Sequence, residues 1–90
     1  MEAPKLKENN CSVLIAEYLT GHVCKKDLTR FRNGENENDA YQIFENFTKA
    51  KEFVIEFVAA HPGFECVIYD WQGEFLLDYD ENGIRNFKPE

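Results

Sequence analysis

Long hydrophobic runs are missing from this chain of 90 residues. No apolar stretch approaches the ~18 residues that a membrane-spanning helix needs, so we expect no membrane partner. The first ten residues, MEAPKLKENN, are polar and lack the apolar core of a secretory signal. We therefore expect a cytoplasmic protein.

Cysteine is scarce and odd in number, with only Cys11, Cys24 and Cys66. Small secreted domains held together by disulfides normally contain an even and denser set. We expect reduced thiols, mostly buried as small apolar side chains.

Basic residues are scarce in the second half of the chain. Residues 1–51 contain eight acidic and eight Lys/Arg residues, whereas residues 52–90 contain nine acidic residues against Arg85 and Lys88, which supplies the whole net charge of −7. An acidic half repels phosphate backbones and attracts basic surfaces. We expect a basic protein as partner and no nucleic acid. Four basic residues within 25–32 nevertheless keep nucleic-acid binding from being excluded.

Apolar residues are sufficient for one small core, since they make up 43% of the chain and include eight Phe, four Tyr and one Trp. A chain of this length normally forms one domain. We expect a flexible tail over residues 1–10 and a single α+β domain over residues 11–90.

The clearest predicted element is a helix near residues 48–61, with Thr48 as its N-cap and Pro62-Gly63 as its stop. Its apolar residues recur at the spacing of one helical face. They are Ala50, Phe53, Val54, Phe57, Val58 and His61. Before it we favour a short strand at Tyr41–Glu45 over a longer helix that starts at about Asp39.

The N-terminal part predicts a hairpin. Residues 11–19, CSVLIAEYL, are apolar and β-branched at their start, which favours a strand, although a short helix remains open. Residues 23–32 form a plausible return strand, and NGENEND at 33–39 is a loop.

The C-terminal part predicts a three-stranded meander. Asp stands first and Gly fourth in two four-residue units, Asp70–Gly73 and Asp80–Gly83, which is the preference of a turn closed by a residue with positive φ. β-rich runs flank both units. With the hairpin, this gives an antiparallel sheet of about five short strands packed on one main helix.

A register that pairs Asp70 with Glu74 predicts the two faces of the meander. One face then shows Val67, Tyr69, Phe75, Leu77 and Tyr79, and we expect the helix to cover it. The other face shows Phe64, Cys66, Ile68 and Leu76, framed by Asp70, Glu74 and Asp78.

Calcium binding is suggested by the alternation of Asp78, Asp80 and Asn82, with Gly83 at the sixth position. A calcium loop of this kind needs a bidentate Glu at position 12, where Pro89 stands, and helices on both sides. The flanking runs favour strands, so we interpret the segment as a hairpin turn.

Other catalytic or metal-binding patterns are weak. Two pairs, His22 with Cys24 and His61 with Cys66, lack the ligand spacing of structural zinc sites. A Cys-His nucleophile has no third residue to orient it, and the chain has no glycine-rich phosphate loop. We expect no metal, no cofactor and no enzymatic activity.

The stretch from Tyr41 to Gly73, YQIFENFTKAKEFVIEFVAAHPGFECVIYDWQG, contains a strand ending in Phe, the helix start F-x-x-A-K-x-F and then E-C-x-I-Y-D before a Gly turn. This layout resembles that of small bacterial proteins, some of which are similar to immunity proteins of toxin systems. The resemblance covers about a third of the chain and implies no functional residue.

Two hypotheses of function follow. The first is a small acidic protein-binding module, immunity-like or inhibitor-like, that neutralises a basic partner such as a nuclease toxin. Its candidate partner-binding residues are Asp70, Trp71, Glu74, Asp78, Asp80 and Glu81. The second is an accessory or structural domain that forms a weak homodimer through its sheet. A metal-dependent enzyme is a third and weaker hypothesis.

Overall fold

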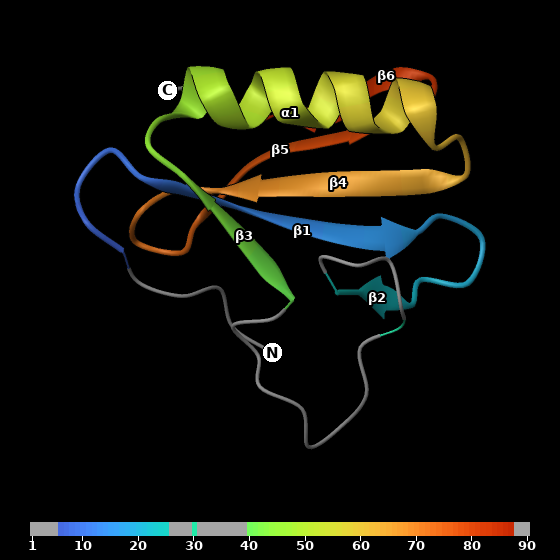
Figure 1. Cartoon of the computed structure of the whole chain (residues 1–90), viewed down its shortest axis with the longest axis horizontal. Coiled ribbons are helices and arrows are strands. Elements are labelled where there is room, and N and C mark those ends of the chain that lie inside the picture. Colours follow the sequence, from blue (N-terminus) through green and yellow to red (C-terminus); the bar gives the residue numbers. More distant parts are fainter. Residues whose placement is uncertain (1–5, 26–29, 31–39, 88–90) are drawn as a thin grey trace.

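The structure is a computed structural model that describes residues 6–25, 30 and 40–87. The elements follow in the order β1 (Cys11–Glu17), β2 (Val23–Cys24), β3 (Tyr41–Phe44), α1 (Phe47–Ala60), β4 (Phe64–Tyr69), β5 (Phe75–Asp80) and β6 (Gly83–Phe87). Figure 1 shows α1 lying across an antiparallel sheet, which confirms the predicted α+β class.

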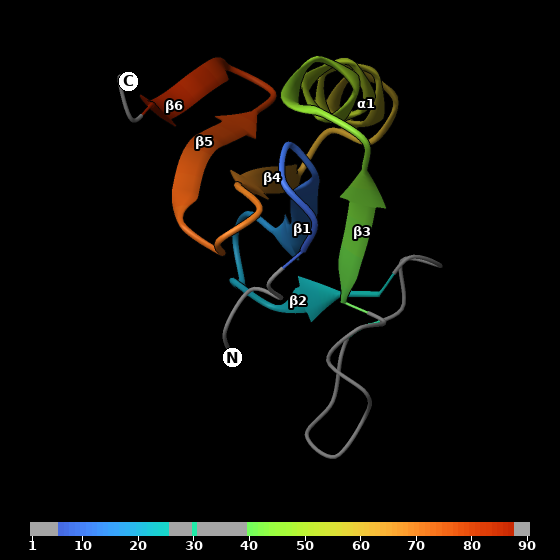
Figure 2. The same cartoon turned by 90° about the vertical axis from the view of Figure 1, so that its left-hand side faces the viewer.

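The first strand, β1, lies inside the sheet. On one side, Ser12–Glu17 of this strand pair with β4, while its other side pairs with β3 over Cys11–Leu14 and with β2 at Ile15 and Ala16. Beyond β4, the sheet continues through β5 to β6, which is the predicted meander. Figure 2 shows that β5 and β6 curl up on one side of α1, while β3 lies below α1, beyond β1.

The core lies between α1 and the sheet. Ala50, Val54 and Val58 are buried on the helix, and Phe53 and Phe57 pack against them, as the predicted apolar face requires. Their buried partners on the strands are Cys11, Val13, Ile15, Cys24, Cys66, Ile68 and Leu77. The predicted helical face is therefore confirmed.

The predicted N-cap of the helix, Thr48, is wrong by two residues. The N-cap is Asn46, whose backbone is extended and whose side-chain oxygen accepts a hydrogen bond of 2.9 Å from the backbone N–H of Lys49. Thr48 already lies inside α1. Phe47 packs against the core, so the helix begins early enough to include it. The short strand before the helix, β3, is confirmed.

The predicted register of the meander is correct at its turn and wrong beyond it. Tyr69 pairs with Phe75 as expected, but a β-bulge shifts the next pair to Ile68 with Leu77. Leu76 is the additional residue in β5. Because side chains alternate along a strand, Cys66 and Ile68 face α1, and the prediction that Val67 and Tyr69 do so is wrong.

The N-terminal hairpin is confirmed in part. Strand β1 ends at Glu17, earlier than predicted. The return strand β2 has two residues, and Cys24 also forms an isolated pairing with Arg30, while residues 26–29 and 31–32 of the predicted strand lie outside the described residues. The predicted loop at 33–39 lies outside the described residues. The tail over residues 1–10 stays a prediction, although the N–H of Leu6 donates to the carbonyl of Trp71 at 2.8 Å.

Candidate functional site

Both Asp-Gly units of the meander form the predicted turns. Gly73 has a φ of 85° and Gly83 a φ of 102°, in the region that favours glycine. In the first turn, Oδ1 of Asp70 accepts hydrogen bonds from the backbone N–H groups of Gln72 and Glu74, each at 2.9 Å. These bonds make the Asp70 carboxylate part of the turn's own structure.

The second turn uses its aspartate in the same way. Oδ1 of Asp80 accepts a hydrogen bond of 2.8 Å from the N–H of Asn82, and Asp80 is only 3% exposed. Asp78, Asp80 and Asn82, which alternate before Gly83, thus belong to the hairpin of β5 and β6, as predicted. A side chain so deeply buried offers little surface to a partner protein.

The structure separates the six candidate residues into two groups. Asp70, Trp71 and Glu74 gather in the turn between β4 and β5, which we call the Trp71 turn. Asp80 and Glu81 lie at the other end of β5, a strand of six residues or roughly 20 Å. Asp78 lies between the groups, paired with Val67 and Asn86.

Two hollows flank Trp71, which is 37% exposed. The large hollow has a volume of about 810 Å³ and the small hollow about 350 Å³. Trp71 lines both, with Asp70 in the large hollow and Glu74 in the small one. An aromatic ring with open space on two sides is typical of a residue that anchors a partner.

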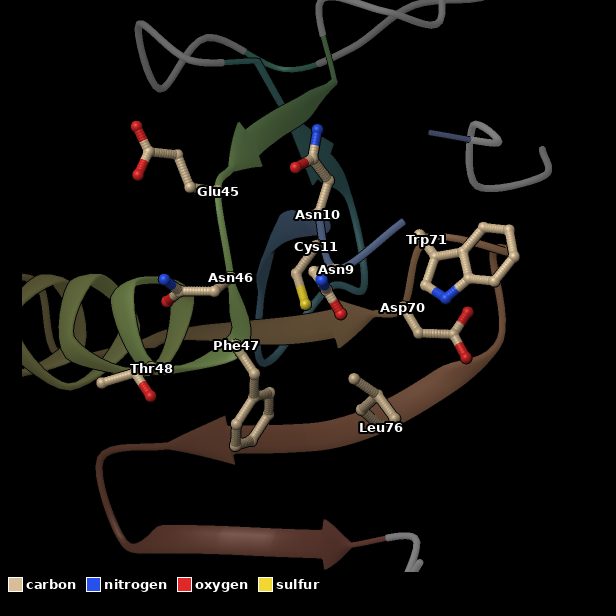
Figure 3. Close-up of a pocket in the computed structure, with 10 residues that line it drawn as sticks. All are labelled: Asn9, Asn10, Cys11, Glu45, Asn46, Phe47, Thr48, Asp70, Trp71 and Leu76. Atoms are coloured by element: carbon tan, nitrogen blue, oxygen red, sulfur yellow. The ribbon is translucent and has the colours of Figure 1, made fainter. Parts of the chain in front are cut away.

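Three distant segments build the large hollow. Residues 9–11 come from the start of β1, residues 45–48 lead into α1, and Asp70, Trp71 and Leu76 belong to the β4–β5 hairpin. Figure 3 shows these side chains around an opening, with Cys11 near its centre, Asp70 and Trp71 on one side, and residues 45–48 across from them.

The large hollow has an apolar floor and a charged rim. Phe47 and Leu76 are partly buried against the core, and Cys11 is buried beside them. Burial, and after it the nearby charge of Asp70, raises the pKa of the Cys11 thiol. On the opposite side, Glu45 forms an exposed ion pair of 2.9 Å with Lys49.

Sequence reasoning found Asp70 and Trp71 but missed the residues that face them across the hollow, which are Asn9, Asn10, Asn46 and Phe47. They lie far from residue 70 in the chain, and only the pairing of β1 with both β3 and β4 brings them near it. The sequence held one local sign of a turn before β1: Asn9 has a φ of 74°, and Asn is enriched among residues with positive φ.

The three cysteines are all buried and free, as predicted. Burial raises the pKa of Cys66 to about 12. Within residues 6–25, 30 and 40–87, no three His, Cys, Asp or Glu side chains gather closely enough to hold a metal ion. Among the same residues, no helix combines the length and the apolar character needed to cross a bilayer.

Comparison of the chain with protein-family models, with curated proteins and with solved structures finds no match. The fold and the geometry of the Trp71 turn therefore carry the functional argument.

Proposed function

We propose that this chain is a small acidic protein-binding module that binds a basic protein partner through the Trp71 turn and its two hollows. The observation that carries the proposal is the exposed indole of Trp71 between two hollows, with Asp70 and Glu74 beside it. Aromatic anchors surrounded by a polar rim are typical of protein interfaces.

The charge distribution supports a basic partner. The half of the chain that contains the Trp71 turn carries the net charge of −7. Such a surface accelerates association with a basic protein and disfavours acidic competitors. Three of the six candidate residues play no part in this proposal, because Asp80 is buried and both Asp78 and Glu81 lie away from the Trp71 turn.

The finer form of the proposal is an inhibitor of the immunity type, which covers a basic enzyme such as a nuclease toxin. It follows from the resemblance of residues 41–73 and from the charge. An inhibitor of this kind needs no catalytic group of its own. Three free, buried thiols suit the reducing cytoplasm, where we place its action.

The test compares two charge reversals of equal size. Proteins captured from the source cell are identified, and association of the purified basic candidate is measured by surface plasmon resonance at low and high salt. Glu74→Lys should lower the association rate, because Glu74 lies beside Trp71, and its backbone bonds to Asp70 do not depend on its side chain. Trp71→Ala should increase the dissociation rate.

Glu56→Lys is the matched control, since Glu56 is exposed on α1 and the change in net charge is the same. It should bind as the wild type does. If Glu56→Lys and Glu74→Lys slow association equally, only net charge matters, and the Trp71 turn is not the binding surface.

Self-association is the second candidate function. Strand β6 is the last strand of the sheet, and Ile84 on it is 51% exposed. An exposed strand edge is a template for pairing with another chain. A dimer in sedimentation equilibrium that Ile84→Lys abolishes, while Trp71→Ala leaves it intact, would favour this function.

A further inference from the structure

We propose that the large hollow beside Trp71 receives an arginine side chain of the partner protein. This inference rests on the proposed function, because it names the group that a basic partner would insert. Three properties of the hollow carry it: its apolar floor, the placement of its charges and the exposed indole.

The floor fits the aliphatic part of a long basic side chain. Phe47 and Leu76 pack against the core on one side and line the hollow on the other. Arginine and lysine bury their methylene stems along such surfaces while the charged group stays at the rim. A short or purely polar side chain would leave this floor uncovered.

The rim provides carboxylate for the charged group. Both hydrogen bonds to Asp70 use Oδ1, so Oδ2 has no hydrogen-bond partner among the described residues. Across the hollow, the ion pair of Glu45 with Lys49 is exposed, at 79% and 57% of the side chains, and such pairs are weak. A guanidinium group can therefore compete for Glu45 as well.

The indole favours arginine over lysine. A planar guanidinium can lie flat on an aromatic face while it donates to a carboxylate oxygen, whereas a compact ammonium cannot stack in this way. Trp71 lies next to Asp70 in the turn, so stacking and charge pairing are available at the same place.

The N-terminus of α1 favours an anion over a cation in the large hollow, because the positive end of a helix attracts anions. Two features offset it. The side chain of Asn46 accepts the N–H of Lys49, which occupies one of the free donors of the first turn. An anion in the hollow would also meet the carboxylates of Asp70 and Glu45. We therefore expect a cation.

Trp71 is the only tryptophan of the chain, so its fluorescence reports directly on the hollow. The probe is the capped peptide acetyl-Gly-Arg-Gly-amide, titrated into the purified protein at low salt. We expect a saturable change in emission with a Kd of about 1–10 mM, the range for one side chain. The matched peptide with citrulline, which has the same shape and no charge, should bind at least about tenfold more weakly, which is about 1.4 kcal/mol.

Asp70→Asn tests the rim, because an amide oxygen can still accept the two backbone hydrogen bonds of the turn. We expect a loss of affinity for the arginine peptide of about tenfold with an unchanged circular dichroism spectrum, whereas Glu56→Gln should bind as the wild type does. If Asp70→Asn unfolds the turn, the variant Glu45→Gln is tested in its place and should weaken binding of the arginine peptide severalfold.

Three results would overturn the inference: no saturable change in emission, equal binding of the citrulline peptide, or unchanged affinity in both rim variants. Saturable binding of inorganic phosphate instead of the arginine peptide would do the same. Each of these results leaves the protein-binding proposal standing as long as Glu74→Lys slows association with the basic partner.

Discussion

Replacing Phe57 by alanine tests the packing of α1 on the sheet. Phe57 stacks on Phe53 at a ring-centroid distance of 5.6 Å and meets the edge of Phe64 at 5.9 Å. It also lies 4.7 Å from the ring of His61. These contacts join the helix to β4, so their loss should reduce the stability of the whole domain.

The expected cost follows from the burial of the ring. Truncation of a fully buried Phe costs ~3–5 kcal/mol, but Phe57 is only partly buried, so the burial term falls to about 2 kcal/mol. The lost aromatic contacts add about 0.5–1 kcal/mol. The sum of about 2–3 kcal/mol lies below the ~5–15 kcal/mol of a typical domain, so the variant should still fold.

Urea unfolding followed by circular dichroism measures this cost, as a lower midpoint at an unchanged slope. In a thermal scan, the same loss should lower Tm by roughly 8–20 °C. Glu56→Ala, at an exposed position one residue before Phe57, should cost less than about 0.5 kcal/mol. Equal losses of unfolding free energy in the two variants would show that Phe57 does not face the sheet as described.

Two further predictions concern the helix start and the central thiol. Asn46→Ala should cost about 1 kcal/mol in urea unfolding, because it removes the cap of the Lys49 N–H, while Thr48→Ala should cost much less. The opposite order would place the N-cap at Thr48. Cys66 should resist alkylation by iodoacetamide at pH 8, since burial raises its pKa to about 12 and its thiolate is scarce at that pH. Reaction in urea is the control, and native Cys66 reacting as fast as an unfolded thiol would contradict this prediction.

The sequence predicted the elements of this fold better than their register. The apolar residues of α1 and the Asp-Gly units of the meander are local patterns, and the structure shows both. The bulge at Leu76 has no such local pattern. The extra residue in β5 puts Leu77 and Tyr79 on the same face as Ile68 and Cys66, so the face of β4 that was predicted to lie outside belongs to the core.

The candidate surface was predictable only in part, for a similar reason. Asp70, Trp71 and Glu74 lie in one turn and were found together. The rest of the large hollow, including Asn9 and Phe47, depends on strand pairings between distant segments. Periodicity reports which face of an element is apolar, but it does not report which elements become neighbours.

The interior position of β1 has a consequence for how the protein folds. Ser12 pairs with Tyr69 and Glu17 with Phe64, so each ladder contact closes a loop of about half the chain or more. Contacts of such long range make folding slow. During synthesis, the apolar strand CSVLIAE leaves the ribosome well before β4 exists to cover its edge. In that interval the nascent chain presents an unpaired hydrophobic strand, the kind of edge at which incompletely folded chains aggregate.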